Sequence, residues 1–480
     1  MWYVGQKGWA LGKRPSPVWV ADSRPPCLLL TALGSSLATN TPGAGPGLWT
    51  HGPSQAVGSM RTKRNRGKRP HIPPTTYHLP PTTYRTPMPN PRIHLAIDNC
   101  FASKRWTNPI EWARIVQQLG LRCVEASADN ECDPLYADPG YLKDWVGEVQ
   151  SACKETGVRV VNLYSGHGTY TTLGLAHPDR RNQERILNLW LKVMIANAAQ
   201  LGAGLGFFCH AFNERILQDP LAYAEAEEAL YGRLAEVAAY AQQCGLRAIG
   251  LEQMYSPHQT PWTLDGAQGL LRELCRRCDR PFYLTVDTGH QAGQRKFLRP
   301  TSRQLRDALQ TLRASGKLEG GLWLGPDAAY THFRHAAAAP KSQEEVHLQR
   351  VEEEMDRYPY LFASFDDGDT YLWLRRFACY SPIIHLQQTD GKSSSHRPFT
   401  EENNQQGIIR AEKVLQAVAD SYNRQPEPDM PPRCEEIYLT LEIFSSTADL
   451  PDEILERLAQ SVAYWRRYIP KDGLSLEELL

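Results

Sequence analysis

The 480-residue chain lacks any run of 18 or more apolar residues, the length of a membrane-spanning helix, so we expect no membrane contact. It also lacks a convincing secretory signal, because the apolar stretch CLLLTAL (27–33) is short and no cleavage site follows it. Its 11 cysteines are odd in number and show no disulfide-type spacing, which indicates a reducing compartment. The nearest pair, Cys275 and Cys278, has no second pair to complete a zinc site. These absences predict a cytoplasmic protein.

The chain has no net charge, but its charges are unevenly distributed. Residues 1–92 contain 12 Lys and Arg residues and a single acid, Asp22, whereas the remainder has 52 acidic and 41 basic residues. An acidic surface repels a phosphate backbone. We therefore expect no nucleic-acid partner.

Residues 1–92 are rich in Pro, Gly, Ser, Thr and Arg and show neither helical nor strand periodicity. This composition predicts a disordered basic extension, followed by one catalytic domain at 93–480. The cluster RTKRNRGKR (Arg61–Arg69) is compatible with a nuclear-localisation or nucleic-acid patch, and a solvated tail is the simpler interpretation. Met88 is an alternative start of the protein.

From Ile93 onward, short apolar runs alternate with longer amphipathic stretches, the pattern of βα units around a parallel sheet. Glycines such as Gly157 and Gly245 mark the ends of helices before several strands. Eight runs favour a closed (β/α)8 TIM barrel, and the alternative, an open doubly wound sheet, lacks a GxGxxG motif after the first strand. The runs begin at Ile93, Cys123, Arg159, Gly204, Arg247, Phe282, Pro382 and Ile437. A long insertion between the sixth and seventh strands (Gln291–Ser381) predicts extra helices and part of a lid.

Four ionisable residues fall near the ends of the last four predicted strands: Glu252, Asp287, His385 and Glu442. The carboxyl ends of the strands carry the active site of a TIM barrel, so these side chains are expected to converge. Crowded carboxylates repel one another, and a divalent cation relieves the repulsion. Three oxygen ligands and one imidazole favour Mn²⁺, with Mg²⁺, Co²⁺ or Zn²⁺ as alternatives. For any single residue, a cap, a salt bridge or a satisfied core group is the other interpretation.

The segments LEQM, TVDTGH, IIHLQQTDG and LTLEIF resemble the strand-end motifs of the xylose isomerase-like TIM barrels. Within this superfamily, the chain resembles the ketose 3-epimerase and sugar-phosphate isomerase/epimerase branch over Ile93–Tyr468. Its pattern is Glu, then Asp-x-x-His, then His, then Glu. The resemblance implies four metal ligands and places His290 on the substrate-binding histidine of the family. The implied ligands are Glu252, Asp287, His385 and Glu442.

The resemblance further implies a metal-dependent isomerase or epimerase of a ketose or ketose phosphate, acting through a cis-enediolate. Either Glu252 or Glu442 removes the proton α to the carbonyl, and the position at which it returns decides between an epimer and an aldose–ketose isomer. The sequence leaves both outcomes open. The expected partner is a small-molecule sugar or sugar phosphate, and a homo-oligomer also stays open.

Further substrate contacts are expected from residues near the strand ends, each with a structural or solvated role as the alternative. They are His167, His210, His258, Lys392 and Trp106. Lys392 begins a polar loop with three serines, Ser393–Ser395, after the seventh strand, where TIM barrels often bind phosphate. A tetrulose phosphate 3-epimerase is therefore the favoured specific hypothesis.

Two rival functions remain. An abasic-site endonuclease-type metal hydrolase of the same superfamily needs an Asp-x-His motif after the seventh strand, whereas Asp390 and His396 lie six residues apart. A non-catalytic sugar-binding barrel is the other rival, and the loss of a ligand would indicate it. All four predicted ligands are present.

Overall fold

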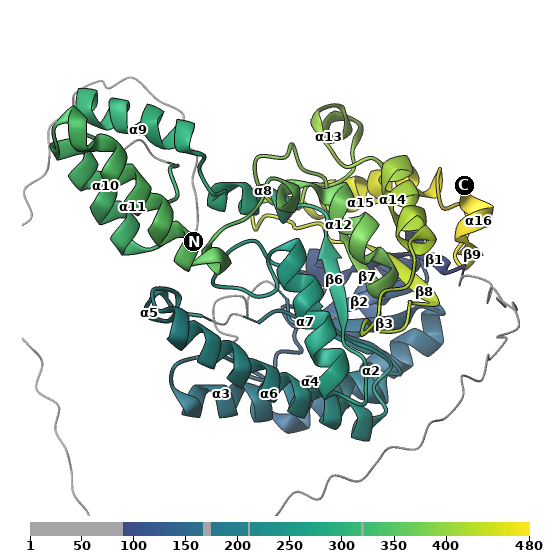
Figure 1. Ribbon diagram of the computed structural model, residues 1–480. Coiled ribbons are helices and arrows are strands. Elements are labelled where there is room, and N and C mark those ends of the chain that lie inside the picture. The colour runs from purple at the N-terminus through teal and green to yellow at the C-terminus, as the bar shows by residue number, and fades with distance from the viewer. Residues whose placement is uncertain (1–89, 167–173, 210–211, 318–320) are drawn as a thin grey trace, which may run out of the picture. The chain divides into compact units, whose positions relative to one another are not determined.

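The computed structural model describes residues 90–166, 174–209, 212–317 and 321–480. Eight parallel strands form a closed barrel, because the sheet runs from β2 to β8 and on to β1, and β1 pairs again with β2 (Figure 1). The strands are β1 (Arg92–Asp98), β2 (Cys123–Ser127), β3 (Arg159–Tyr164), β4 (Gly204–Phe207), β5 (Ile249–Glu252), β6 (Tyr283–Asp287), β7 (Ile383–Leu386) and β8 (Glu436–Leu441). The predicted TIM barrel is confirmed, and the closure excludes the open sheet.

The predicted boundary of the basic extension shifts slightly. Residues 1–89 lie outside the described part of the chain, so the expected disorder stays a prediction there. Arg92 already belongs to β1 and pairs with Glu436 of β8, so the barrel begins one residue before the predicted Ile93. Among the described residues, no helix is both long and apolar enough to cross a membrane.

Alternate side chains of each strand point into the barrel and form layers, as the two-residue period of a strand requires. The middle layer is apolar except for one tyrosine hydroxyl, and all its members are buried: Ala96, Cys123, Val161, Ile383 and Tyr438. Two residues further along β2, β7 and β8, the inward positions change to polar and charged side chains. This change places the charged layer at the carboxyl ends of the strands.

Amphipathic helices surround the strands (Figure 1). They are α1 (Pro109–Gln118), α2 (Pro139–Thr156), α3 (Arg180–Ile186), α4 (Lys192–Gln200), α5 (Glu214–Leu217), α6 (Pro220–Cys244), α7 (Leu264–Arg277), α13 (Glu401–Gln406), α14 (Ala411–Asn423), α15 (Pro451–Arg466) and α16 (Leu476–Leu479). A π-helical turn (Leu187–Leu191) joins α3 to α4. A short strand, β9 (Leu474–Ser475), pairs antiparallel with the start of β1.

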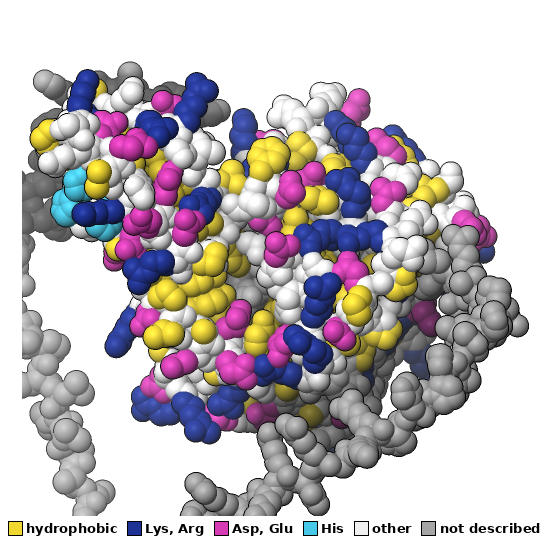
Figure 2. All heavy atoms as spheres, in the orientation of Figure 1, with side chains coloured by type: hydrophobic (Ala, Val, Ile, Leu, Met, Phe, Trp, Pro, Cys, Tyr) yellow, Lys and Arg dark blue, Asp and Glu magenta, His cyan; other side chains and the backbone are white. Residues whose placement is uncertain are grey.

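The insertion between β6 and β7 contains extra helices, as predicted. They are α8 (Gln291–Gln294), α9 (Ser302–Ser315), α10 (Asp327–Ala338), α11 (Glu344–Arg357) and α12 (Thr370–Phe377). The insertion contacts the barrel helices through a stack of Tyr360 on Tyr223 of α6, with ring centroids 3.8 Å apart. Histidine side chains gather on the surface of the helical group, on a face that otherwise mixes both signs of charge (Figure 2).

Replacing either of two glycines, one inside α6 and one at its end, should change the free energy of unfolding in opposite directions. Gly245 ends the helix with φ +67°, whereas Gly232 is exposed inside it, and an added Cβ meets no atom within 4 Å at either position. Gly245→Ala should lower the free energy of unfolding by about 1 kcal/mol, because an L-residue is strained at positive φ. Gly232→Ala should raise it by about 0.5–1 kcal/mol. Urea denaturation measures both, and equal effects would contradict the assigned helix end.

Candidate metal centre and substrate cavity

Glu252, Asp287, His385 and Glu442 lie together at the carboxyl ends of β5 to β8. One potential ligand atom from each residue can be chosen so that all four atoms lie within 4.8 Å of one another. All four side chains are buried, and none is more than 4% exposed. The parallel strands bring these residues together although 190 positions separate the first from the last. The convergence expected from the strand ends is therefore observed.

His385 lies at the centre of this group. Its Nδ1 is 3.1 Å from Glu252 Oε1 and 3.3 Å from Glu442 Oε2. Its Nε2 is 2.8 Å from Glu125 Oε2, on the other side of the ring. One imidazole thus bridges three buried carboxylates, and its Nδ1 faces two of the predicted metal ligands.

Glu125, a fully buried residue of β2, holds the far side of His385. Its other oxygen, Oε1, accepts a hydrogen bond of 2.6 Å from the Asn162 side chain on β3. With its carboxylate fixed in this way, Glu125 can accept the Nε2 proton of His385 and leave Nδ1 as a lone-pair donor. The sequence interpretation missed Glu125, although a lone acid inside the apolar run CVEASA was a visible signal.

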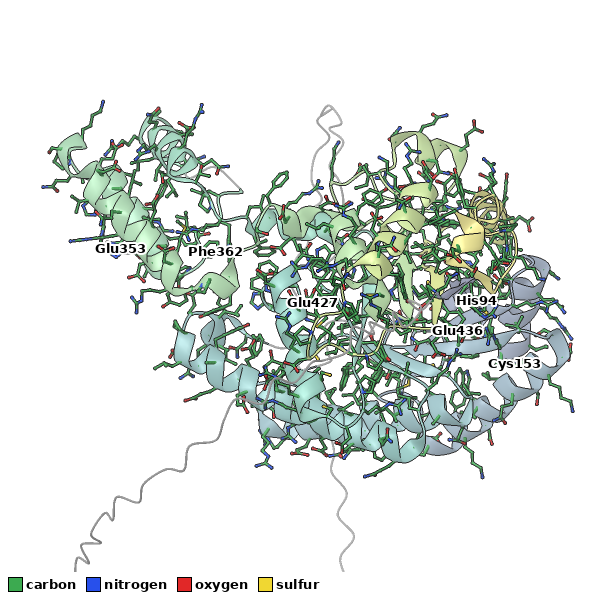
Figure 3. All side chains as sticks on the ribbon, turned by 45° about the vertical axis from the view of Figure 1, so that its right-hand side comes forward. His94, Cys153, Glu353, Phe362, Glu427 and Glu436 are labelled. Carbon is green, nitrogen blue, oxygen red and sulfur yellow. The ribbon has the colours of Figure 1, made fainter. Side chains whose placement is uncertain are left out.

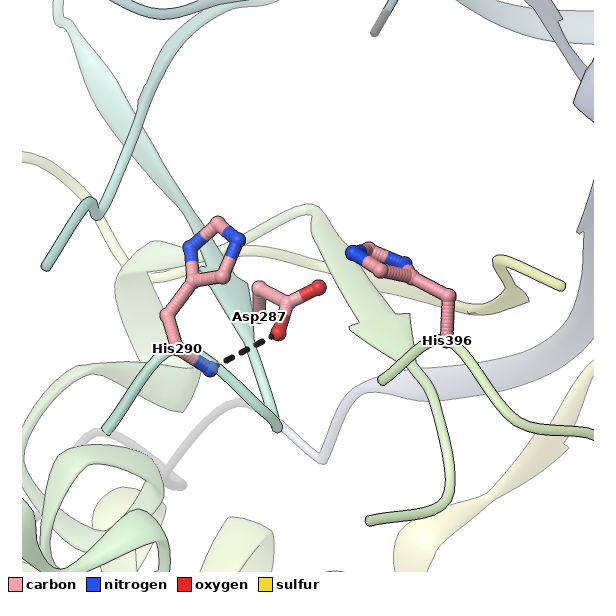
Figure 4. Close-up of side chains that lie close together, drawn as sticks. All are labelled: Asp287, His290 and His396. Atoms are coloured by element: carbon pink, nitrogen blue, oxygen red, sulfur yellow. Dashed lines mark hydrogen bonds between the residues drawn. The ribbon is translucent and has the colours of Figure 1, made fainter. Parts of the chain in front are cut away.

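Asp287 is held by the chain just after β6. Its Oδ1 accepts hydrogen bonds from the backbone N–H groups of Gly289 (2.6 Å) and His290 (3.1 Å), the second drawn in Figure 4. The Gln387 side-chain amide donates to both Asp287 oxygens, at 2.8 and 2.9 Å. The Asp-x-x-His motif therefore fixes the carboxylate by its own turn, and Gln387 supports it from β7.

His290 and His396 approach Asp287 from two sides (Figure 4), and the three residues form a second group with potential ligand atoms within 4.8 Å. His290 Nδ1 lies 2.7 Å from the Gln253 carbonyl oxygen, so it donates there and leaves Nε2 available. His396 stacks on Phe444, with ring centroids 3.9 Å apart, and its Nδ1 is 3.4 Å from Glu442 Oε2.

The abasic-site alternative needs Asp390 and His396 to act together. Asp390 instead lies 3.7 Å from Arg397 and caps the backbone N–H of Lys392 at 3.0 Å. The two candidate ligands of that alternative therefore have different partners.

Burial and crowding shift the acid–base equilibria of the group. Burial, then the charges of Asp287 and Glu252, raises the pKa of Glu442 well above its usual value. Burial acts in the same direction on Asp287, but the charges of His290, His396 and His385 outweigh it and lower the pKa. Burial lowers the pKa of His385, and the charges of Glu442 and Glu125 reverse the effect, so it rises well above its usual value. Burial and crowding therefore favour the uptake of compensating positive charge by this group.

The donor atoms fit a divalent cation. Three carboxylates and one imidazole are the ligand types that Mn²⁺, Mg²⁺ and Co²⁺ accept. Glu442 Oε2 is buried and makes no hydrogen bond, although His385 Nδ1 lies 3.3 Å away. A buried acceptor of this kind is costly unless another group satisfies it, and a cation at this place would do so.

A cavity of about 240 Å³ opens beside this group. Its polar lining combines both glutamates with residues of the loop after β7 and with one side chain each from β3 and the turn after β6. These residues are Tyr164, Glu252, His290, Ser394, Ser395, His396 and Glu442. Phe208, Met254, Tyr255 and Phe444 supply apolar walls. The Tyr164 hydroxyl donates a hydrogen bond to Glu252 Oε2, so one of the two predicted catalytic carboxylates is oriented at the cavity wall.

The other predicted contacts lie apart from this cavity or outside the described residues. His258 Nδ1 is 2.7 Å from the Phe212 carbonyl oxygen, Trp106 packs on Phe101, and Lys392 is exposed. None of the three is among the described residues that line the cavity. His167 and His210 lie outside the described residues. A substrate-binding role for these five residues stays a prediction, as does the lid, because no described residue of Gln291–Ser381 lines the cavity.

Comparison with known proteins agrees with this architecture. Residues 113–315 match the family model described as xylose isomerase-like TIM barrel. The match covers less than half of the chain and is similar in fold to the closed barrel described above. The resemblance stated from the strand-end motifs is thereby confirmed.

Two similar proteins are informative. The D-erythrulose 1-phosphate 3-epimerase of Brucella abortus (strain 2308) is 33% identical over 116 residues, which are 24% of this chain and 34% of that protein. The matched part thus spans about a third of the curated relative. A crystal structure of a candidate xylose isomerase from Rhodospirillum rubrum superposes with a TM-score of 0.55 at 20% identity, covering 78% of this chain and 99% of that one. This second likeness concerns the fold alone.

Glu125→Gln tests the arrangement around His385. A neutral amide accepts the Nε2 proton less strongly, so we expect Mn²⁺ affinity to fall by about 10–100-fold. Calorimetric titration of Mn²⁺ into the metal-free protein measures this. Glu155→Gln is the matched control, because Glu155 is exposed and paired with Arg114 at 2.7 Å. Equal Mn²⁺ affinities of the two variants would contradict the role given to Glu125.

Proposed function

We propose that this protein is a divalent-metal-dependent isomerase or epimerase of ketoses or ketose phosphates. The observation that carries the proposal is that Glu252 and Glu442 both line one cavity and both belong to the four-residue ligand group. Two carboxylates next to one substrate are what proton removal and proton return require. The Brucella abortus relative is an epimerase, which supports the same class of reaction.

The predicted ligands, Glu252, Asp287, His385 and Glu442, would hold the cation. When bound, it supplies positive charge next to the substrate oxygens, where negative charge develops as the α proton leaves. Mn²⁺ is the favoured ion on the donor set, with Mg²⁺, Co²⁺ or Zn²⁺ as alternatives.

The residues of the chain perform the proton transfers. Glu252 is the last residue of β5 and Glu442 directly follows β8, so the two carboxylates reach the cavity from different strands of the barrel. One removes the proton from the substrate carbon, and the other returns a proton to the same carbon or to its neighbour. Tyr164 orients Glu252 by its hydrogen bond, while His290 presents Nε2 to the substrate because its Nδ1 is bound to Gln253.

A short, phosphorylated ketose is the favoured substrate class, and 3-epimerisation of a tetrulose phosphate is the specific form of the proposal. The cavity of about 240 Å³ is smaller than the roughly 300–1,000 Å³ of sites for drug-sized ligands. Ser394 and Ser395 add hydroxyl donors to its wall, in the loop where TIM barrels often hold phosphate. The Brucella relative is an epimerase of a tetrulose phosphate, which supports the same substrate class.

Glu252→Gln and Glu442→Gln should each lower turnover by about 10²–10⁴-fold, because each removes a group that transfers a proton. The assay incubates the Mn²⁺-loaded protein with a panel of ketoses and ketose phosphates in D2O and locates the deuterium by NMR. Deuterium at C3 indicates an epimerase, and deuterium at C1 or C2 indicates an isomerase.

Glu401→Gln, an exposed change in α13, is the control for these two variants. Circular dichroism and Mn²⁺ titration separate lost proton transfer from lost folding or lost metal. Wild-type protein that exchanges no deuterium with any member of the panel would contradict catalysis and favour a sugar-binding barrel.

Ser394→Ala combined with Ser395→Ala tests the phosphate contact. We expect KM for a tetrulose phosphate to rise by about tenfold, because phosphate binding loses two hydroxyl donors. The effects on kcat and on the KM for the unphosphorylated ketose should be smaller, since they arise only from the loss of the hydrogen bonds between Ser394 and its neighbours Gln387 (2.9 Å) and His396 (3.2 Å). Steady-state kinetics on both substrates measure the difference. Equal losses on both substrates would show that the serines act on the sugar itself.

A further inference from the structure

A second cavity, of about 530 Å³, lies at the amino ends of the strands, opposite the candidate metal centre. The residues that matter in its wall come from strand starts, from the turn before β2 and from the segment after α15: His94, Arg122, Arg159, Arg466, Lys471 and Asp472. The proposed function makes no use of this end of the barrel.

The charges on the wall are predominantly positive. Arg466 is paired with Asp472, at 2.8 and 3.1 Å, and this pair balances itself. Arg159 donates to the Tyr438 hydroxyl at 3.2 Å and forms no ion pair among the described residues. Arg122 and Lys471 are exposed and also form none within that part of the chain. Three positive charges therefore lack a counter-ion in a region, 93–480, that carries 52 acids and 41 bases.

His94 adds a buried polar group to the same wall. It is 7% exposed, and its Nδ1 makes no hydrogen bond. Its ring stacks on Tyr438, with centroids 4.9 Å apart. Its Nε2 lies 3.3 Å from Glu436 Oε1, and both residues are labelled in Figure 3. Burial lowers the pKa of His94. With Nε2 directed at Glu436, Nδ1 can accept a hydrogen bond from a hydroxyl group of a ligand, although not from phosphate oxygens.

We propose that this cavity binds the phosphate group of a small molecule, with Arg122, Arg159 and Lys471 contacting the phosphate oxygens. Three cations match a phosphate dianion, and a guanidinium can donate to two of its oxygens at once. A volume of about 530 Å³ exceeds the needs of inorganic phosphate, so an attached organic part has room.

This site is separate from the candidate metal centre. Glu436 begins β8 and Glu442 comes six positions later, a distance of roughly 20 Å along an extended strand. The buried middle layer, which includes Ala96 and Val161, lies between the two ends. One ligand therefore cannot contact both sites.

The test is calorimetric titration of the full-length, metal-free chain with inorganic phosphate and, separately, with glucose 6-phosphate. Arg122→Ala combined with Lys471→Ala should weaken binding by at least about tenfold. Lys143→Ala combined with Lys154→Ala, two exposed lysines of α2, removes the same charge elsewhere and should leave binding unchanged. Tighter binding of glucose 6-phosphate than of phosphate would indicate a phosphomonoester as the ligand, and equal binding would indicate phosphate itself.

Equal affinity in the Arg122/Lys471 variant and the Lys143/Lys154 control would overturn the proposal. So would the absence of binding at millimolar phosphate, or a loss of binding only when Ser394 and Ser395 are replaced. Turnover in the deuterium assay should be the same in the Arg122/Lys471 variant and the wild type. The failure of this inference is thus distinguishable from the failure of the proposed enzymatic function.

Discussion

Mutual repulsion among buried carboxylates is the constraint on which the structure at the carboxyl ends of the strands depends. Glu125, Glu252, Asp287 and Glu442 are each at most 4% exposed, and the imidazole of His385 contacts three of them. Water cannot screen these charges, so protons or a cation must compensate them. A stability-driven core would not collect such groups in one place. Their concentration in one place agrees with the proposed binding of a cation as part of the function.

The surrounding structure restricts how that compensation can occur. Asp287 is fixed by two backbone N–H groups and by Gln387, and Glu125 is fixed by Asn162. His385 therefore cannot turn its Nδ1 away from Glu252 and Glu442 without losing its contact with Glu125. Groups that are oriented before a ligand arrives lose little entropy when it binds. The strands thus hold the predicted ligands in fixed orientations, while the loop after β7 adds Ser394 and His396 to the site.

The barrel and its four strand-end residues could be predicted from sequence because both follow from periodicity. Glu252, Asp287 and Glu442 interrupt apolar runs at the same relative position, and parallel strands must bring such positions to one end. Glu125 could not be placed in this way, because it lies in the middle of β2 and reaches the group only through His385. His396 depends on the path of an irregular loop, which no period encodes. The cavity at the amino ends of the strands combines strand starts with a turn and the segment around the end of α15, and no periodicity in the sequence predicts this combination.

The apolar layer formed by Ala96, Cys123, Val161, Ile383 and Tyr438 has a consequence for how the two ends of the barrel can evolve. It is a dry partition, and a substitution on one side reaches the other only through the strands themselves. Residues at the amino end can therefore drift, acquire a ligand or lose one without disturbing the chemistry at the carboxyl end. The two ends of this one barrel can thus change independently of each other.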